Sequence, residues 1–202
     1  MKSTRFIPIA ALAFAAACSD TATSPTSSVA DRPQFLVAAG SYTDPLADAQ
    51  TGIQDANAPS GGHLTNQSGD PTCLVNADFS IDCSAYAIGG VGHTNAFVSL
   101  EATWTATIDC INPAGGKNTN NPIESHEGTF SDADEATLTP GRNGTLRVGS
   151  RTVDPASVAQ GCPNANWRPE IREGSIQLVS FTYSLHFDGF AANDFAVFIQ
   201  AS

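Results

Sequence analysis

The sequence predicts an all-β fold, an antiparallel β-sandwich of immunoglobulin-like architecture that is stapled by disulfide bonds. Three features predict it: one long segment in which apolar and polar residues alternate, several short apolar segments separated by Gly, Pro and Asn, and an even number of cysteines behind an export signal. Alternation places successive side chains on opposite faces of a strand, and short strands between turn residues are typical of sandwiches.

The strongest strand signal runs from Ala96 to Cys110. Every even position in it is apolar, Trp104 included, while the odd positions are mostly Ser, Thr, Glu and Asp. This pattern indicates a half-buried strand, or two strands bent at a bulge, and excludes an amphipathic helix. We expect Trp104 in the core.

A second long strand is predicted from Val179 to Phe187. Its apolar residues are at odd positions, whereas Ile176 and Leu178 just before it are apolar residues at even positions. We therefore expect a β-bulge near Leu178 that changes the register. Phe195 to Ile199 predicts a further strand. Shorter strands are expected at 79–83, 123–130 and 145–148, and one helical turn at 154–160.

The N-terminus has the pattern of a bacterial export signal. Residues 1–17 combine a basic head with a short apolar run that is too short to cross a bilayer, which predicts a signal peptide. Cys18 follows three alanines, the place where lipoproteins are cleaved and diacylated, which predicts a membrane partner through a lipid anchor, facing the periplasm or the cell exterior. Ala15 stands where Leu is usual, so ordinary cleavage that leaves Cys18 free remains open.

Composition then divides the rest of the chain. Residues 18–70 are rich in Ser, Thr, Ala, Asp, Gly and Pro, and are expected to be a lipidated cysteine and a flexible tether. Residues 71–202 are expected to form the sandwich. Within the tether, the apolar Phe35-Leu36-Val37 is either an edge strand or an interaction point, and both interpretations stay open.

Charge argues against nucleic acid as a partner. Without Lys2 and Arg5, seven of the nine basic residues remain against 20 acidic ones, a formal net charge of −13. Such a chain binds polyanions poorly.

The cysteines beyond Cys18 predict two disulfides, for which three connectivities exist. Cys73 and Cys83 are equidistant from Asp78, so a turn there sets them opposite each other on a hairpin. That leaves Cys110 to pair with Cys162. A zinc site of four thiolates is disfavoured, because it requires closely spaced cysteine pairs and a reducing compartment.

Three short motifs carry a resemblance. They are Cys83 with the glycine-rich 89–92, Cys110-Ile111-Asn112 followed by Gly115-Gly116, and Cys162-Pro163-Asn164. With them the chain resembles a group of uncharacterised secreted bacterial proteins that share Cys-x-Asn-x-Gly-Gly and Cys-Pro-Asn motifs, although Ala114 adds one residue here. The resemblance implies the sandwich and the Cys110–Cys162 pairing, and brings no activity.

Recognisable catalytic chemistry is missing from the sequence, which holds no Gly-x-Ser-x-Gly, His-Glu-x-x-His, phosphate-loop or dinucleotide motif. An enzyme is therefore disfavoured, and no cofactor is expected. Calcium is the one metal for which there is a candidate, because Asp132, Asp134 and Glu135 cluster in an expected loop. A solvated acidic turn explains the cluster equally well. The four histidines, at 63, 93, 126 and 186, are too scattered for a local metal site.

One aromatic residue suggests a ligand. Trp167 lies in an expected loop with Asn164, Asn166 and Arg168, a composition suited to stacking and hydrogen bonding with a sugar. The competing interpretation makes Trp167 a buried cap on one end of the sandwich. Tyr86 and Phe97 are also expected to face outward.

The favoured function is a surface-displayed binding or adhesion module for a glycan or an envelope protein. The alternative is a structural envelope lipoprotein without a small ligand, and a hydrolase with an unrecognised site is the least favoured class.

The lipid anchor gives a direct prediction. Labelling with a fatty-acid analogue should tag the wild-type chain and leave Cys18→Ser untagged, because only the sulfur of Cys18 receives the diacyl group. Equal labelling of the two chains would contradict the anchor.

Overall fold

Antiparallel strands form nearly all of the regular structure in the computed structural model, which describes residues 36–66, 69–112, 124–157 and 161–202. Within these ranges, two short 3₁₀ helices, η1 and η3, are the other elements. The elements are β1 (Gly40–Thr43), η1 (Asp55–Asn57), β2 (His63–Leu64), β3 (Thr72–Val75), β4 (Ile81–Cys83), β5 (Tyr86–Gly89), β6 (Ala96–Ile111), β7 (Glu124–Leu138), β8 (Leu146–Val148), β9 (Arg151–Val153), η3 (Pro155–Ser157), β10 (Arg168–Ile171), β11 (Gln177–Phe187) and β12 (Phe195–Ala201).

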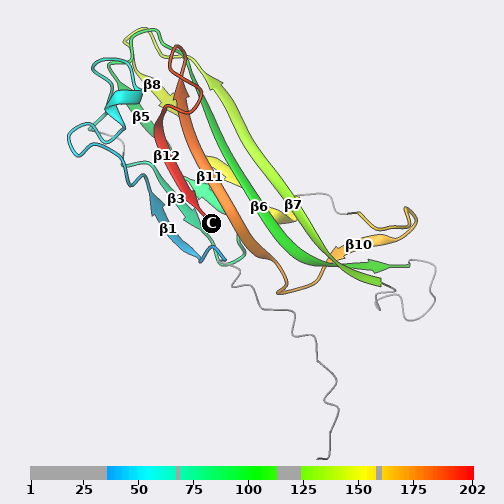
Figure 1. Ribbon diagram of the computed structural model, residues 1–202. Helices are drawn as coiled ribbons and strands as arrows, with labels where there is room; N and C mark the ends of the chain where they lie inside the picture. The colour runs from blue at the N-terminus through cyan, green and yellow to red at the C-terminus, as the bar shows by residue number, and fades with distance from the viewer. Residues whose placement is uncertain (1–35, 67–68, 113–123, 158–160) are drawn as a thin grey trace, which may run out of the picture. The chain divides into compact units, whose positions relative to one another are not determined.

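The strands form three antiparallel sheets that make up a sandwich, which confirms the predicted fold class (Figure 1). In the five-stranded large sheet, β6 pairs with β7 along one side and with β11 and then β10 along the other, and β12 lies beyond β11. The opposite layer is divided between a four-stranded sheet, β1-β3-β4-β9, and a three-stranded sheet, β2-β5-β8. Inward side chains of all three sheets share one hydrophobic core.

The alternation predicted for β6 is confirmed. All of its even residues from Ala96 to Cys110 are buried, and Trp104 is fully buried. The predicted bulge is also present, since the pairing of β11 with β6 changes register between Leu178 and Ser180. β12 confirms the expected C-terminal strand.

Trp104 joins the two layers through its ring nitrogen. The Nε1–H of Trp104 donates a hydrogen bond of 2.9 Å to the carbonyl oxygen of Phe79, in the turn between β3 and β4. Phe79 has a φ of 64°, in the left-handed region that is uncommon for a residue other than glycine. A buried indole needs a partner for its N–H, so the turn and the core stabilise each other.

Tyr86 corrects one expectation, because it faces the core and is only 4% exposed. Its hydroxyl lies 3.0 Å from that of Tyr183, so β5 and β11 meet through a buried hydroxyl pair. Burial raises the pKa of Tyr183 to about 12 and raises the pKa of Tyr86 well above its ordinary value. Phe97 does face outward, at 40% exposed.

Both predicted disulfides are present. Cys73 and Cys83 are directly paired residues of the β3–β4 hairpin, with Cα atoms 4.0 Å apart. The second bond joins Cys110, near the C-terminal end of β6, to Cys162, with Cα atoms 5.9 Å apart. The first closes a local hairpin, and the second fastens a distant segment to the large sheet.

The expected boundary at residue 71 is wrong, because the fold already includes described residues before it. β1 pairs with β3 and β2 pairs with β5, while Ile53 between them is fully buried. Val37 is buried as well and donates its N–H to the carbonyl of Leu178, although no strand forms at 36–38. The short edge strands were missed because they carry too few residues for visible alternation.

The smaller predicted elements are found with altered lengths. The strands expected at 79–83 and 145–148 are β4 and β8, and the one expected at 123–130 is the start of the longer β7. The helical turn expected at 154–160 is η3, with residues 158–160 outside the described part of the chain.

The signal peptide of residues 1–17 and Cys18 also lie outside the described part. Among the described residues, no helix has the length and apolar character needed to cross a membrane.

The two disulfides should differ in their contribution to stability. The residues joined are 10 apart in Cys73–Cys83 and 52 apart in Cys110–Cys162, so the chain-entropy model gives about 3 and about 4 kcal/mol. Urea denaturation should show the larger loss for Cys110→Ala/Cys162→Ala than for Cys73→Ala/Cys83→Ala. The reverse order would mean that packing around the hairpin, and not loop closure, dominates.

Candidate functional site

The predicted ligand loop is a tight turn immediately before β10. The N–H of Trp167 donates to the carbonyl oxygen of Asn164 at 2.9 Å, and the N–H of Asn166 donates to the side-chain oxygen of Asn164 at 3.0 Å. Asn side chains commonly stabilise turns in this way. The sequence Asn164-Ala165-Asn166 therefore shapes the turn that carries Trp167.

Trp167 is half-buried and is not part of the hydrophobic core. The residue is thus neither a fully buried cap nor a fully exposed platform, and part of it remains open to solvent. Asn164, Asn166 and Arg168 are all exposed. Asn164, Asn166 and Trp167 lie on the turn, and Arg168 is the first residue of β10. Arg168 is not free, however, because its guanidinium forms an ion pair of 2.7 Å with Glu170.

One covalent restraint and one backbone pairing hold this turn against the large sheet. The disulfide from Cys110 fixes Cys162 before the turn, and the pairing of Arg168 with Ile111 begins directly after it. The turn therefore has little freedom to move independently of β6.

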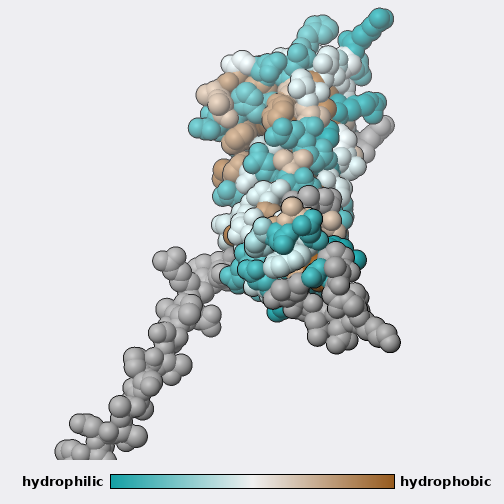
Figure 2. Space-filling model, turned by 90° about the vertical axis from the view of Figure 1, so that its right-hand side faces the viewer, coloured by the Kyte–Doolittle hydropathy of each residue, from teal (hydrophilic) through white to brown (hydrophobic). Residues whose placement is uncertain are grey.

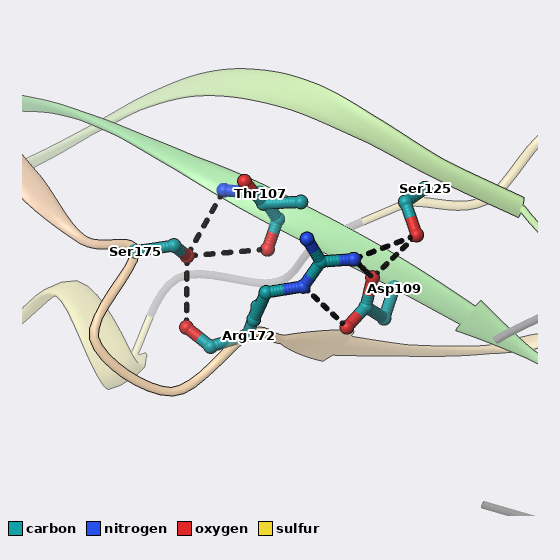
Figure 3. Close-up of polar contacts among 5 residues, drawn as sticks. All are labelled: Thr107, Asp109, Ser125, Arg172 and Ser175. Carbon is teal, nitrogen blue, oxygen red and sulfur yellow. Dashed lines mark hydrogen bonds and ion pairs between the residues drawn. The ribbon is translucent and has the colours of Figure 1, made fainter. Parts of the chain in front are cut away.

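A polar network that the sequence analysis missed fixes the other end of β10 (Figure 3). The Arg172 guanidinium donates twice to Asp109 of β6, from Nη2 to Oδ1 at 2.7 Å and from Nε to Oδ2 at 3.1 Å. It also donates to the hydroxyl of Ser125 on β7 at 3.0 Å, and Ser125 donates to Asp109 at 2.6 Å. One arginine thus links three neighbouring segments.

Ser175 completes this Arg172 network on the turn that leads to β11. Its Oγ accepts the N–H of Thr107 at 3.0 Å, and its hydroxyl lies 2.8 Å from the carbonyl oxygen of Arg172 and 3.4 Å from that of Thr107. Arg172 also donates its own N–H to the Thr107 carbonyl at 2.9 Å. Backbone and side-chain hydrogen bonds therefore both hold this turn against β6.

The network changes the acid–base properties of its ion pair. The pKa of Asp109 lies below the ordinary value, chiefly because Arg172 and then Ser125 donate hydrogen bonds to its carboxylate. The same contact raises the pKa of Arg172. Both groups stay charged at neutral pH. The sequence alone places Asp109 on the polar face of its strand. It does not indicate the partner of Asp109, because Arg172 is 63 residues away.

The acidic candidate site is corrected by the structure. Asp132, Asp134 and Glu135 lie in β7 and not in a loop, and alternation directs Glu135 to the face opposite the other two. Asp134 instead forms an ion pair of 2.8 Å with Arg151 and accepts the N–H of Thr152 at 3.2 Å. Within the described ranges, no group of three or more His, Cys, Asp or Glu residues could hold a metal ion.

The histidines lie on separate elements. His63 is in β2, with its Nδ1 2.8 Å from the carbonyl oxygen of Gly61, and His126 is in β7. The Nε2 of His186, in β11, is 3.0 Å from the carbonyl oxygen of Ala191. His93 is exposed in the turn before β6. None of the four belongs to a group that could hold a metal ion within the described part of the chain.

A second surface with hydrogen-bonding groups lies over the three-stranded sheet. It is an open groove of about 590 Å³ with small residues such as Ala85 and Ala87 beside Thr65, Asn143 and Arg147. The sequence analysis did not single out these residues, because they come from three separate segments that only the sheet brings together.

Comparison of the chain with protein-family models, with curated proteins and with solved structures finds no match.

The Arg172 network predicts a pH-dependent stability. Because the folded-state pKa of Asp109 lies below 3.8, its ionised form favours folding above the unfolded-state pKa, and this contribution is lost as pH falls through the folded-state pKa. Asp109→Asn should lower the melting temperature slightly at neutral pH, since solvent screens an exposed pair, and should match wild type at pH values well below 3.8.

Glu173→Gln is the matched control, because Glu173 is exposed on the same turn and none of the hydrogen bonds of the network involves it. A difference between Asp109→Asn and wild type that persisted at the acidic limit would contradict a role for the ionised carboxylate.

Proposed function

We propose that the protein is an exported, lipid-anchored binding module of the cell envelope, and that the Trp167 turn is where it contacts a glycan. The observation that carries the proposal is a partly exposed tryptophan on a turn that is restrained on both sides. Structural tryptophans of a sandwich are normally buried among core side chains, as Trp104 is.

The chemistry of the turn suits a sugar. An indole ring offers an apolar face to the C–H groups of a pyranose, and the exposed amides of Asn164 and Asn166 offer donors and acceptors for its hydroxyls. Arg168 adds a further donor group beside Glu170. Restraint of the turn by the Cys110–Cys162 disulfide reduces the ordering entropy that binding would otherwise lose.

Export is supported by two independent features. Disulfides form and persist in oxidising compartments, and the described chain contains two of them. The basic head, the apolar run and Cys18 match the signal of a bacterial lipoprotein. A structural envelope lipoprotein without a ligand is the competing proposal, and the half-buried state of Trp167 is the observation that favours it.

A polysaccharide screen with matched variants separates these proposals. The purified protein is tested against envelope and plant polysaccharides, and any ligand found is measured again with Trp167→Ala and Arg147→Ala. Trp167→Ala should weaken binding at least tenfold and shift the melting temperature by less than about 4 °C, because Trp167 is outside the core. Arg147→Ala should bind like wild type.

Two outcomes contradict the assignment. Loss of binding in Arg147→Ala alone would move the site to the groove over the three-stranded sheet. A fall in the melting temperature of Trp167→Ala by clearly more than 4 °C, with no binding to any polysaccharide, would make Trp167 structural.

A further inference from the structure

β7 is a long edge strand with one unpaired side. Its 15 residues pair with β6 in one continuous register, from Leu138 opposite Ala96 to Glu124 opposite Cys110. No other described strand pairs with β7, and no backbone–backbone hydrogen bond outside that pairing involves its residues. The N–H of Ala133 donates locally to the side chain of Asp132 at 3.0 Å, and β9 is bonded to the strand through the Asp134 side chain. At 3.2–3.4 Å per residue, the edge without a partner strand is roughly 50 Å long.

Natural sheets usually protect such an edge. Common devices are a very short strand, a proline, a β-bulge or a charged side chain. β7 is long, contains no proline and keeps its register with β6 without a bulge. Charge is the one device present, because the strand carries five carboxylates and neither Lys nor Arg: Glu124, Glu127, Asp132, Asp134 and Glu135.

These charges are unevenly compensated. On the inner side, Asp134 pairs with Arg151. On the outer face, Glu135 and Glu101 of β6 both lie within hydrogen-bond distance of the Ser99 hydroxyl, at 3.3 and 3.2 Å. One hydroxyl has one proton and satisfies one carboxylate at a time. Neither carboxylate has an ion-pair partner among the described residues.

The polarity of the β7 side can be followed in the space-filling view. Figure 2 shows hydrophilic and neutral residues over most of that face, with hydrophobic ones in separate groups. The exposed Glu127 and Glu135 are eight residues apart on the outer face of the strand. An added strand would meet backbone hydrogen-bonding groups and negative charge, and little apolar surface.

A second copy of the chain is a poor occupant. If two β7 strands paired antiparallel about Ser131, Glu127 of each copy would lie opposite Glu135 of the other. Like charges directly opposite each other destabilise a strand pair. Any other register still brings together two strands with five carboxylates each and no cation. The charge thus opposes self-association while leaving the backbone edge available.

We propose that β7 is the docking edge for an extended, basic segment of another protein, which adds to the large sheet as a further antiparallel strand. The segment would need about nine residues or more without an internal proline, and Lys or Arg at two positions eight apart, opposite Glu127 and Glu135. Backbone hydrogen bonds would provide affinity and the two cations would fix the register. This site is independent of the Trp167 turn.

The test uses the purified full chain and a synthetic peptide as the probe. The peptide has 11 residues of Thr and Val, with Lys at positions 2 and 10, and a second peptide carries Glu at those positions. The lysine peptide should bind and should slow amide hydrogen exchange along β7, and the glutamate peptide should not. Glu127→Lys/Glu135→Lys should weaken binding about tenfold or more, the equivalent of two lost or reversed cross-strand charge pairs.

Two controls separate strand addition from general attraction. Glu173→Lys/Asp188→Lys makes the same change of net charge at exposed positions outside β7 and should bind within about twofold of wild type. Two N-methylated lysine peptides are then compared, one blocked on alternate amides of even number and the other on those of odd number. Only one of them should retain binding, because one edge of the peptide faces β7.

Equal binding by both N-methylated peptides would show attraction without strand pairing and would overturn the proposal. So would wild-type affinity in Glu127→Lys/Glu135→Lys, or failure of the lysine peptide to bind at all. None of these outcomes depends on whether the Trp167 turn binds a glycan.

Discussion

The alternation of β6 is the constraint on which the rest of the structure depends. Its inner face carries Trp104 into the core and ends at Cys110, the anchor of the long-range disulfide. Its outer face carries Asp109, which holds Arg172. Because the period of a strand is two, a shift of one residue in β6 would exchange these faces and disconnect both layers at once.

The same strand explains why the Trp167 turn has a defined position. β10 is only four residues long and could not hold its place by pairing alone. The disulfide before it and the Arg172 network after it supply restraint from both faces of β6. A short edge strand is thereby converted into a fixed platform, and loops on rigid scaffolds are common places for recognition.

The sequence was informative where the determining contacts are local or periodic. The alternation of β6, the bulge at Leu178 and the hairpin of Cys73 with Cys83 all follow from neighbouring residues. Edge strands were harder to predict, since β1 and β2 have too few residues for a period.

The errors have physical causes of the same kind. The acidic residues of β7 suggested a loop because carboxylates are rare in strands, yet an exposed edge strand tolerates them. Tyr86 was placed outside because a short strand gives no reliable parity. The pairing of Asp109 with Arg172 joins residues 63 apart and depends on how β10 returns to β6, which no local pattern encodes.

The contrast between the two tryptophans has a practical consequence. Trp104 is enclosed and hydrogen-bonded to Phe79, whereas Trp167 is in part open to solvent on a surface turn. A dissolved collisional quencher will therefore reach one indole and not the other, so the intrinsic fluorescence divides into a fraction that reports on the integrity of the core and a fraction that reports on the turn. The chain thus carries, without any added label, separate optical signals for unfolding and for events at one end of its large sheet.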